Sequence, residues 1–336
     1  MFKGSKVIAM ILAFGMAHSA HAAPLTLPSS PARSVTSIRQ LANNPALVTT
    51  SGQDIMVIRR AEDPSHAKHR FLVQGGLHGD EALTSSFVLW LSQRYISGQS
   101  LLNQLPANDV AIDFVPFANP DGARVSSRTN SRGVNLNRNF GILWGLSREH
   151  PGTSSFSEAE TKALRWLLTQ QKYTAAVDVH GYVNWIVAPS PRNLIPTREK
   201  SDLSRTPEMH ARWIKALQEE QQETMPGYEL RTAGGLGDGG AFEDYAFWSA
   251  GSYAFCLEMA SNQRIDQTIQ QGIRDLLMPQ SLDASRTDSF LRYERFVFRA
   301  FQRALDLKQT TPGLAAEGLD PNGLTLQNLK ALIPSH

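Results

Sequence analysis

The chain is 336 residues long, its formal charge is nearly balanced at +2, and 41% of its residues are hydrophobic. This near-neutral balance argues against nucleic acid as a partner, and the hydrophobic content is enough for one large core. The single cysteine, Cys256, excludes an internal disulfide, and we expect it to be a small buried side chain.

The first 22 residues have the pattern of a secretory signal. Lys3 and Lys6 precede an apolar stretch that is too short to span a bilayer, and Ala20-His21-Ala22 has the small-x-small pattern of a cleavage site. We therefore expect an exported protein, periplasmic or secreted, with no membrane span after cleavage. An uncleaved anchor is the alternative. Residues 23–36, rich in Pro, Ser and Ala, predict an extended leader.

Strand and helix patterns alternate after this leader. We expect one α/β domain over 37–308, built on a mixed, mostly parallel twisted sheet with helices on both faces, followed by a C-terminal tail over 309–336. The helix at 157–171 has Ser157 as its N-cap and Glu160 three residues later, which predicts a capping box. The predicted strands lie at 54–60, 70–76, 109–120, 173–181 and 252–260, and the predicted helices at 82–96, 157–171 and 287–305.

Polar side chains follow three of these strands, and in open α/β sheets sites gather at the carboxyl ends of strands. His78 and Glu81 follow the second strand, His180 ends the fourth, and Glu258 ends the last. Any one of them is more often an ordinary hydrogen-bonded residue. Together, two imidazoles and one carboxylate form a catalytic zinc set that leaves a fourth position for water. Glu258 would then be free to act as a base.

Two further segments could flank such a site. Residues 117–140 form a loop with four arginines and several asparagines, and such side chains bind carboxylates through paired N–H donors. A solvated charged loop is the alternative. Residues 234–248 begin with five glycines in seven positions, which predicts a mobile loop.

The ordered series HGDE, NPDG, RTNSRGVNLNRNF, FSEAET, DVHGY and CLE resembles the zinc carboxypeptidase superfamily of the carboxypeptidase A type. The resemblance runs from about Phe71 to Ala260. It implies one zinc ion held by His78, Glu81 and His180, with Glu258 as the general base. In such enzymes zinc lowers the pKa of its bound water, and the base passes the water proton to the leaving amine.

The same resemblance assigns the substrate contacts. Asn137 and Arg138 match the pair that binds the terminal carboxylate of the substrate. An arginine upstream polarises the scissile carbonyl, and Arg128 or Arg132 could fill this place, with Arg128 favoured. Asn135 stands where the family often has an aspartate that holds a ligand histidine, and a neutral amide would raise the basicity of that ligand less.

Within the superfamily, the run RTN…RGVNLNRNF and the motif DVHG look similar to bacterial murein peptide amidases, which cut the γ-D-glutamyl-diaminopimelate bond. This resemblance implies a carboxypeptidase acting on peptidoglycan peptides in the periplasm. Glu243 falls where digestive relatives read the substrate side chain, and Asp244 matches a family aspartate on the substrate loop. We hypothesise that Glu243 or Asp244 accepts a free amine of the substrate; a surface carboxylate in a glycine-rich loop is the alternative.

Two other functions compete with a carboxypeptidase. HGDE also resembles the zinc N-acyl amino acid deacylases, although FSEAET and DVHGY point away from them. A pseudoenzyme that binds wall peptides without cutting them is the second alternative, and the presence of all three ligands and Glu258 argues against it.

Overall fold

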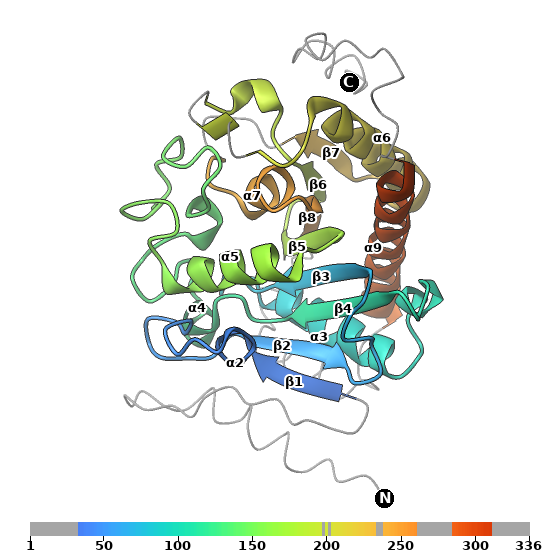
Figure 1. Ribbon diagram of the computed structural model, residues 1–336, viewed down its shortest axis with the longest axis horizontal. Coiled ribbons are helices and arrows are strands. Elements are labelled where there is room, and N and C mark those ends of the chain that lie inside the picture. The colour runs from blue at the N-terminus through green and yellow to red at the C-terminus, as the bar shows by residue number, and fades with distance from the viewer. Residues whose placement is uncertain (1–32, 197–198, 201–202, 233–237, 261–283, 311–336) are drawn as a thin grey trace, which may run out of the picture.

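A computed structural model of the chain describes residues 33–196, 199–200, 203–232, 238–260 and 284–310. Within these residues the protein is an α/β unit around a sheet of eight strands, in the order β1-β2-β4-β3-β5-β8-β6-β7 (Figure 1). The predicted fold class is therefore confirmed. The strands are β1 (Arg33–Ser37), β2 (Met56–Arg60), β3 (His69–Gly75), β4 (Val110–Val115), β5 (Ala175–Gly181), β6 (Trp185–Ala188), β7 (Glu229–Thr232) and β8 (Tyr253–Met259).

The helices lie on both sides of this sheet. The helical segments are α2 (Ile38–Ala42), α3 (Ala82–Ile96), η2 (Leu101–Gln104), α4 (Pro120–Val125), η3 (Leu136–Arg138), α5 (Ala159–Gln171), η4 (Arg192–Leu194), α6 (Pro207–Thr224), α7 (Phe242–Trp248) and α9 (Ala284–Thr310). In Figure 1, α5 and α7 lie on one side of the central strands, and α3 and α9 lie on the other. No helix among the described segments combines the length and apolarity needed to cross a bilayer.

The central strands bring their carboxyl ends to one edge of the sheet. β4, β3, β5 and β8 pair in parallel, and their runs are almost wholly buried, which explains why they read as apolar segments. β2 pairs antiparallel with β4, and β6 pairs antiparallel with β8. In this register His180 of β5 lies directly beside Glu258 of β8. Two residues from distant parts of the sequence therefore meet at the carboxyl edge.

The alternation of side chains decides which face these residues occupy. Phe71 of β3 stacks on Phe301 of α9 at 4.4 Å between ring centroids, and Phe255 of β8 packs on Phe296 of α9 at 5.5 Å. Glu258 is three residues after Phe255 in the same strand, so its side chain leaves from the opposite face. His180, its register partner, shares that face. The site thus lies on the side of the sheet covered by α5 and α7.

Two predicted details at the site edge are wrong. The helix at 157–171 begins only at Ala159, with Glu158 as its N-cap and no side-chain capping bond. The predicted capping box does not form, because the Ser157 hydroxyl contacts Asn139 and Glu158 instead. The second half of the predicted mobile loop at 234–248 is α7, all of whose side chains are buried. Residues 234–237 of that segment lie outside the described residues.

Several elements were not predicted from the sequence, including the strands β1, β6 and β7 and the helices α2, α4 and α6. β1 takes the last residues of the predicted leader and pairs with β2 along its whole length. α6 is capped by Thr206, whose side chain accepts from the Met209 amide. The predicted signal over 1–22, residues 23–32 of the predicted leader and most of the tail over 309–336 lie outside the described residues.

Candidate metal centre

Two of the predicted ligands come from the tight turn between β3 and α3. His78 lies in this turn, and Glu81 is the N-cap residue of α3. The turn is close-packed, because a Cβ at Gly79 would collide with the backbone of Gly122 in α4. Gly76 has a φ of +66°, a left-handed conformation that glycine adopts without strain. These glycines let the chain reverse beside α4 and aim both ligands at one point.

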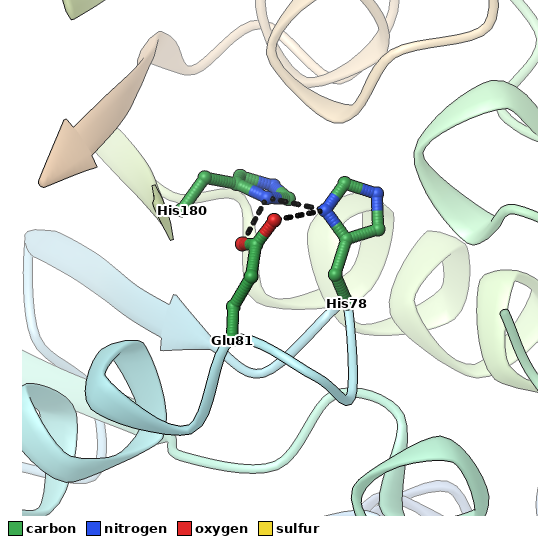
Figure 2. A group of neighbouring side chains, drawn as sticks. All are labelled: His78, Glu81 and His180. Atoms are coloured by element: carbon green, nitrogen blue, oxygen red, sulfur yellow. Dashed lines mark hydrogen bonds and ion pairs between the residues drawn. The ribbon is translucent and has the colours of Figure 1, made fainter. Parts of the chain in front are cut away.

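The third ligand arrives from the neighbouring strand, and the three side chains converge (Figure 2). His78 Nδ1 lies 2.8 Å from Glu81 Oε1, and His180 Nδ1 lies 3.1 Å from Glu81 Oε2. The two Nδ1 atoms are 3.0 Å apart. All three residues are buried. The structure therefore brings together the three residues that the sequence predicts as ligands.

The outer ring nitrogens show which atoms face the centre. His180 Nε2 donates to Asp178 Oδ2 at 2.8 Å, and His78 Nε2 donates to Asn135 Oδ1 at 3.0 Å. The Asn135 amide is oriented by its other contacts, because Oδ1 also accepts from the Asn137 amide. With both Nε2 atoms protonated, each ring directs Nδ1 inward, and in the neutral form of the ring this atom carries a lone pair. Two lone pairs and a carboxylate at this separation fit a bound cation, and this donor set suits zinc.

The electrostatics of the centre favour positive charge. Burial lowers the pKa of His180, but the carboxylates of Asp178 and Glu81 outweigh it and raise this pKa well above its ordinary value. Burial acts against ionised Glu81, yet the two imidazoles hold its pKa below the usual range. Burial and the neighbouring His180 lower the pKa of His78. A metal ion at this point would take the place of the proton on His180.

Asp178 was not predicted as part of the site, although the spacing in DVH contained the signal. Residues two apart on a strand share a face, so an aspartate two positions before a ligand histidine can support its ring.

Of the two candidate arginines, the structure brings Arg128 to the centre. Arg128 Nη1 lies 3.1 Å from His78 Nδ1 and 3.2 Å from Glu81 Oε1, and its side chain is 42% exposed. Arg132 instead pairs with Glu158, with Nε 3.3 Å from Oε2. Arg128 is therefore placed to meet a carbonyl oxygen beside the metal ligands, whereas Arg132 fastens its loop to the start of α5.

The loop that carries Arg128 is held at several points. Asn130 donates through Nδ2 to Glu158 and Glu160, at 2.8 and 3.2 Å, and both carboxylates are buried. Asn130 Oδ1 accepts from the backbone amides of Arg132 and Val134. Ser131 donates to Asp121 in α4. All of these contacts are made by residues that follow Arg128, and they fix the loop on that side.

Glu258 lies beside His180 and opposite Trp185 of β6. Its burial raises the pKa of the carboxyl, an effect that His180 opposes and Glu81 reinforces. A carboxyl group with a raised pKa beside the predicted metal ligands holds a proton more readily than an ordinary glutamate, which suits a group that accepts a proton and returns it.

Asn137 and Arg138 lie in η3, next to the ligands. Asn137 Nδ2 is 3.4 Å from His180 Nε2, and its Oδ1 accepts from the Phe242 amide at 2.8 Å. Arg138 donates through Nη1 to the Asn137 carbonyl, and its Nη2 contacts Asp238 and Glu149, each at 3.1 Å. The predicted carboxylate-binding pair is thus at the site, with the arginine already engaged by acidic side chains.

Glu243 and Asp244 lie in α7 and are buried, so their interpretation as surface carboxylates is wrong. Asp244 accepts from the Ser190 amide and hydroxyl, at 2.5 and 2.9 Å, and burial raises its pKa to about 7. Burial and the neighbouring Asp244 raise the pKa of Glu243 to about 8. Glu243 Oε2 has no hydrogen-bond partner among the described residues. Of the two, Glu243 retains a free acceptor.

Known proteins resemble this chain in sequence and in fold. A family model described as zinc carboxypeptidase matches residues 46–281. Carboxypeptidase SOL1 of Arabidopsis thaliana is 27% identical over 139 residues, which cover 40% of this chain and 27% of that protein. Carboxypeptidase B of Helicoverpa zea is 28% identical over 148 residues, covering 35% of this chain and 33% of that protein. The aligned region thus spans a third or less of these curated relatives.

Among solved structures, the carboxypeptidase A from Helicoverpa armigera superimposes with a TM-score of 0.55 at 18% identity. The match covers 83% of this chain and 70% of that chain. It shows that the two proteins share a fold.

Proposed function

The chain belongs to the zinc carboxypeptidase family, and from that premise we propose that it is a zinc-dependent carboxypeptidase. The observation that carries the proposal is the convergence of His78, Glu81 and His180 at the carboxyl edge of the sheet, with Arg128 against them. A metal bound there supplies a Lewis acid that lowers the pKa of water and polarises a carbonyl. The remaining steps fall to side chains of the chain itself.

Glu258 accepts the proton of the attacking water and returns it to the leaving amine. Its elevated pKa suits both roles, because the group must hold the proton and then release it. Arg128 directs N–H donors toward the point where the carbonyl oxygen becomes negative, a contribution that is usually large in such reactions.

Asn137 and Arg138 select the end of the chain. Their position in η3 places the Asn137 amide beside His180 and the Arg138 guanidinium against the Asn137 carbonyl. A terminal carboxylate bound by this pair sets the last amide bond over the metal ligands, so a carboxyl end is cut rather than an internal bond.

We propose peptidoglycan peptides as the substrates, cut at the γ-D-glutamyl-diaminopimelate bond. This choice is supported by the run RTN…RGVNLNRNF and by DVHG, which resemble murein peptide amidases. The signal pattern in residues 1–22 supports an exported, periplasmic location, where such peptides occur.

The test is mass spectrometry of murein tri- and tetrapeptides incubated with the purified protein, with Glu258→Gln and a chelator as controls. We expect free diaminopimelate, or the corresponding C-terminal product, only from the metal-loaded unsubstituted protein. If ordinary peptides lose C-terminal residues while murein peptides remain uncut, the proposed carboxypeptidase activity is supported and the proposed murein substrate is wrong. Hydrolysis of N-acetylaspartate without peptide cleavage would favour the deacylase. Tight peptide binding without turnover at saturating zinc would favour the pseudoenzyme.

Glu243 is the candidate acceptor for a substrate amine. Both carboxylate oxygens of Asp244 already accept hydrogen bonds from Ser190, whereas Glu243 Oε2 has no hydrogen-bond partner among the described residues. Glu243 is only 3% exposed, so an amine reaches it only when neighbouring side chains shift. We expect Glu243→Gln to lower kcat/KM for a peptide ending in diaminopimelate more than for the same peptide ending in alanine. An equal effect on both substrates removes this assignment.

A further inference from the structure

An unbroken series of contacts joins a metal ligand to the arginine that binds the substrate carboxylate. His78 Nε2 donates to Asn135 Oδ1 at 3.0 Å, and Asn135 Nδ2 donates to Glu149 Oε2 at 3.3 Å. The same Oε2 atom lies 3.1 Å from Arg138 Nη2. Glu149 therefore touches both halves of the site through one oxygen.

The first contacts in this series affect His78 through the side chain that accepts from its Nε2 atom. A carboxylate in contact with a ligand histidine raises the basicity of the ring, and the neutral amide of Asn135 does so less. Glu149 contacts Asn135 and not His78 itself. Its negative charge polarises the Asn135 amide, which makes Asn135 Oδ1 a stronger hydrogen-bond acceptor for His78. It also holds the amide in the orientation that presents Oδ1, and not Nδ2, to the imidazole.

The second half concerns Arg138. Its Nη2 is shared between Glu149 and Asp238, both at 3.1 Å, and both of these carboxylates are about half exposed. An incoming substrate carboxylate competes with them for the guanidinium. When Arg138 turns toward the substrate, Glu149 loses its cationic partner, and its charge acts more fully on Asn135.

On the basis of the proposed function, we propose that Glu149 is a positioning residue that couples carboxylate binding at Arg138 to the metal ligand His78. Asp238 is the matched control. It contacts Arg138 at the same distance as Glu149 does, but the hydrogen bond from Asn135 goes to Glu149. The two carboxylates therefore act alike on the substrate-binding arginine and differ in their access to the metal ligand.

Zinc affinity, measured by competition with a chromophoric chelator and without substrate, tests the coupling. Direct partners of ligand histidines change metal affinity by roughly 10–100-fold, so Glu149→Gln, one contact further out, should weaken zinc binding by up to about tenfold. Glu149→Ala, which also removes one of the contacts that orient the Asn135 amide, should weaken it at least as much. Asp238→Asn should leave zinc affinity unchanged. Both neutral variants should lower KM for a peptide substrate, because Arg138 loses a competing carboxylate.

A double-mutant cycle with Asn135→Asp separates coupling from general damage. With a carboxylate already against His78, Glu149→Gln should no longer weaken zinc binding. Equal losses of zinc affinity in both backgrounds, or unchanged affinity in Glu149→Gln and Glu149→Ala, would overturn the inference. If the unsubstituted protein binds zinc and cuts peptides, that failure concerns Glu149 alone; if it does neither, the proposed function itself fails.

Discussion

At the scale of single residues, Asp178 is the charged partner of the predicted ligand His180. It is fully buried and accepts from His180 Nε2 at 2.8 Å, which directs Nδ1 of that ring toward His78 and Glu81. We expect Asp178→Asn to lower zinc affinity by roughly 10–100-fold, because the ring loses a charged partner. Competition with a chelator measures this.

The metal-free protein provides the control for Asp178→Asn. Asp178 also raises the pKa of the buried Glu243 by repulsion. Removing its charge relieves this repulsion but also removes the carboxylate that stabilises the protonated His180 ring, so we expect the metal-free variant to melt at a lower temperature while it still folds. A metal-free variant that no longer unfolds cooperatively would assign Asp178 a role in folding instead.

Glu243 and Asp244 make the stability of the fold depend on pH. Their pKa values are raised to about 8 and about 7, whereas unfolded chains have values of about 4.3 and 3.9. The folded protein therefore binds these protons more tightly than the unfolded chain. This contribution to stability is complete below pH about 4 and is lost as the pH rises through 7 and 8.

We expect the free energy of unfolding to fall between pH 5 and pH 9, and Glu243→Gln to flatten that fall. Urea unfolding of the metal-free protein at pH 5, 7 and 9 measures the effect. Glu62→Gln, at an exposed position, is the matched control and should reproduce the unsubstituted curve. A curve that stays equally steep in Glu243→Gln would show that the pair does not cause it.

At the scale of elements, the loop bearing Arg128 depends on Asn130. Both hydrogens of its amide are used by the buried carboxylates of Glu158 and Glu160. Asn130→Asp would place a third carboxylate against them and push the loop away from α5. Losing one donor to a developing oxyanion typically costs about 10²–10³ in kcat, so we expect a loss of at least tenfold in kcat with KM little changed.

The matched control is Asn103→Asp in η2, where the same substitution falls at a capping asparagine. It should leave kcat unchanged. Circular dichroism and melting temperatures of both variants show whether each still folds. Full activity in Asn130→Asp would mean that Arg128 keeps its place without this anchor.

The elements also show what the sequence could and could not predict. β3, β5 and β8 were predicted because buried parallel strands read as short apolar runs, and their polar ends marked the ligands and Glu258. The start of α5 was mispredicted because Glu158 and Glu160, which suit a helix start, bind Asn130 of a distant loop instead. Contacts between residues far apart in the chain leave no local pattern in the sequence. Glu149 was missed for the same reason: it lies in a loop, and only the fold brings it to Asn135.

α7 was missed because burial on all sides removes helical periodicity. The segment FEDYAFW has no polar face, and the preceding glycines predict a loop. Its two acidic residues also read as exposed, although the Ser190 amide and hydroxyl satisfy Asp244 inside the protein.

At the scale of the whole molecule, the metal ligands connect elements that are far apart in the chain. His78 and Glu81 lie at the β3–α3 turn and His180 lies near the end of β5, so a cation held by all three would link these elements. A bound metal should therefore stabilise the folded protein against unfolding as a unit. With free zinc at about 100 times its Kd, mass action contributes about 2.7 kcal/mol, which for a chain of this size corresponds to a rise of roughly 4–5 °C in Tm.

Calorimetry of the protein with a chelator and with added zinc measures this shift, and Glu81→Gln supplies the control. That variant keeps the size of the side chain but removes its charge, so zinc should raise its Tm much less. Because Glu81 is ionised while buried, held so by the two imidazoles, the metal-free variant should lose the attraction between Glu81 and His180. A zinc-induced rise of the same size in Glu81→Gln would place the stabilising metal at another site. A zinc-induced rise in Tm that occurs only in the unsubstituted protein would show that zinc stabilises the fold through His78, Glu81 and His180.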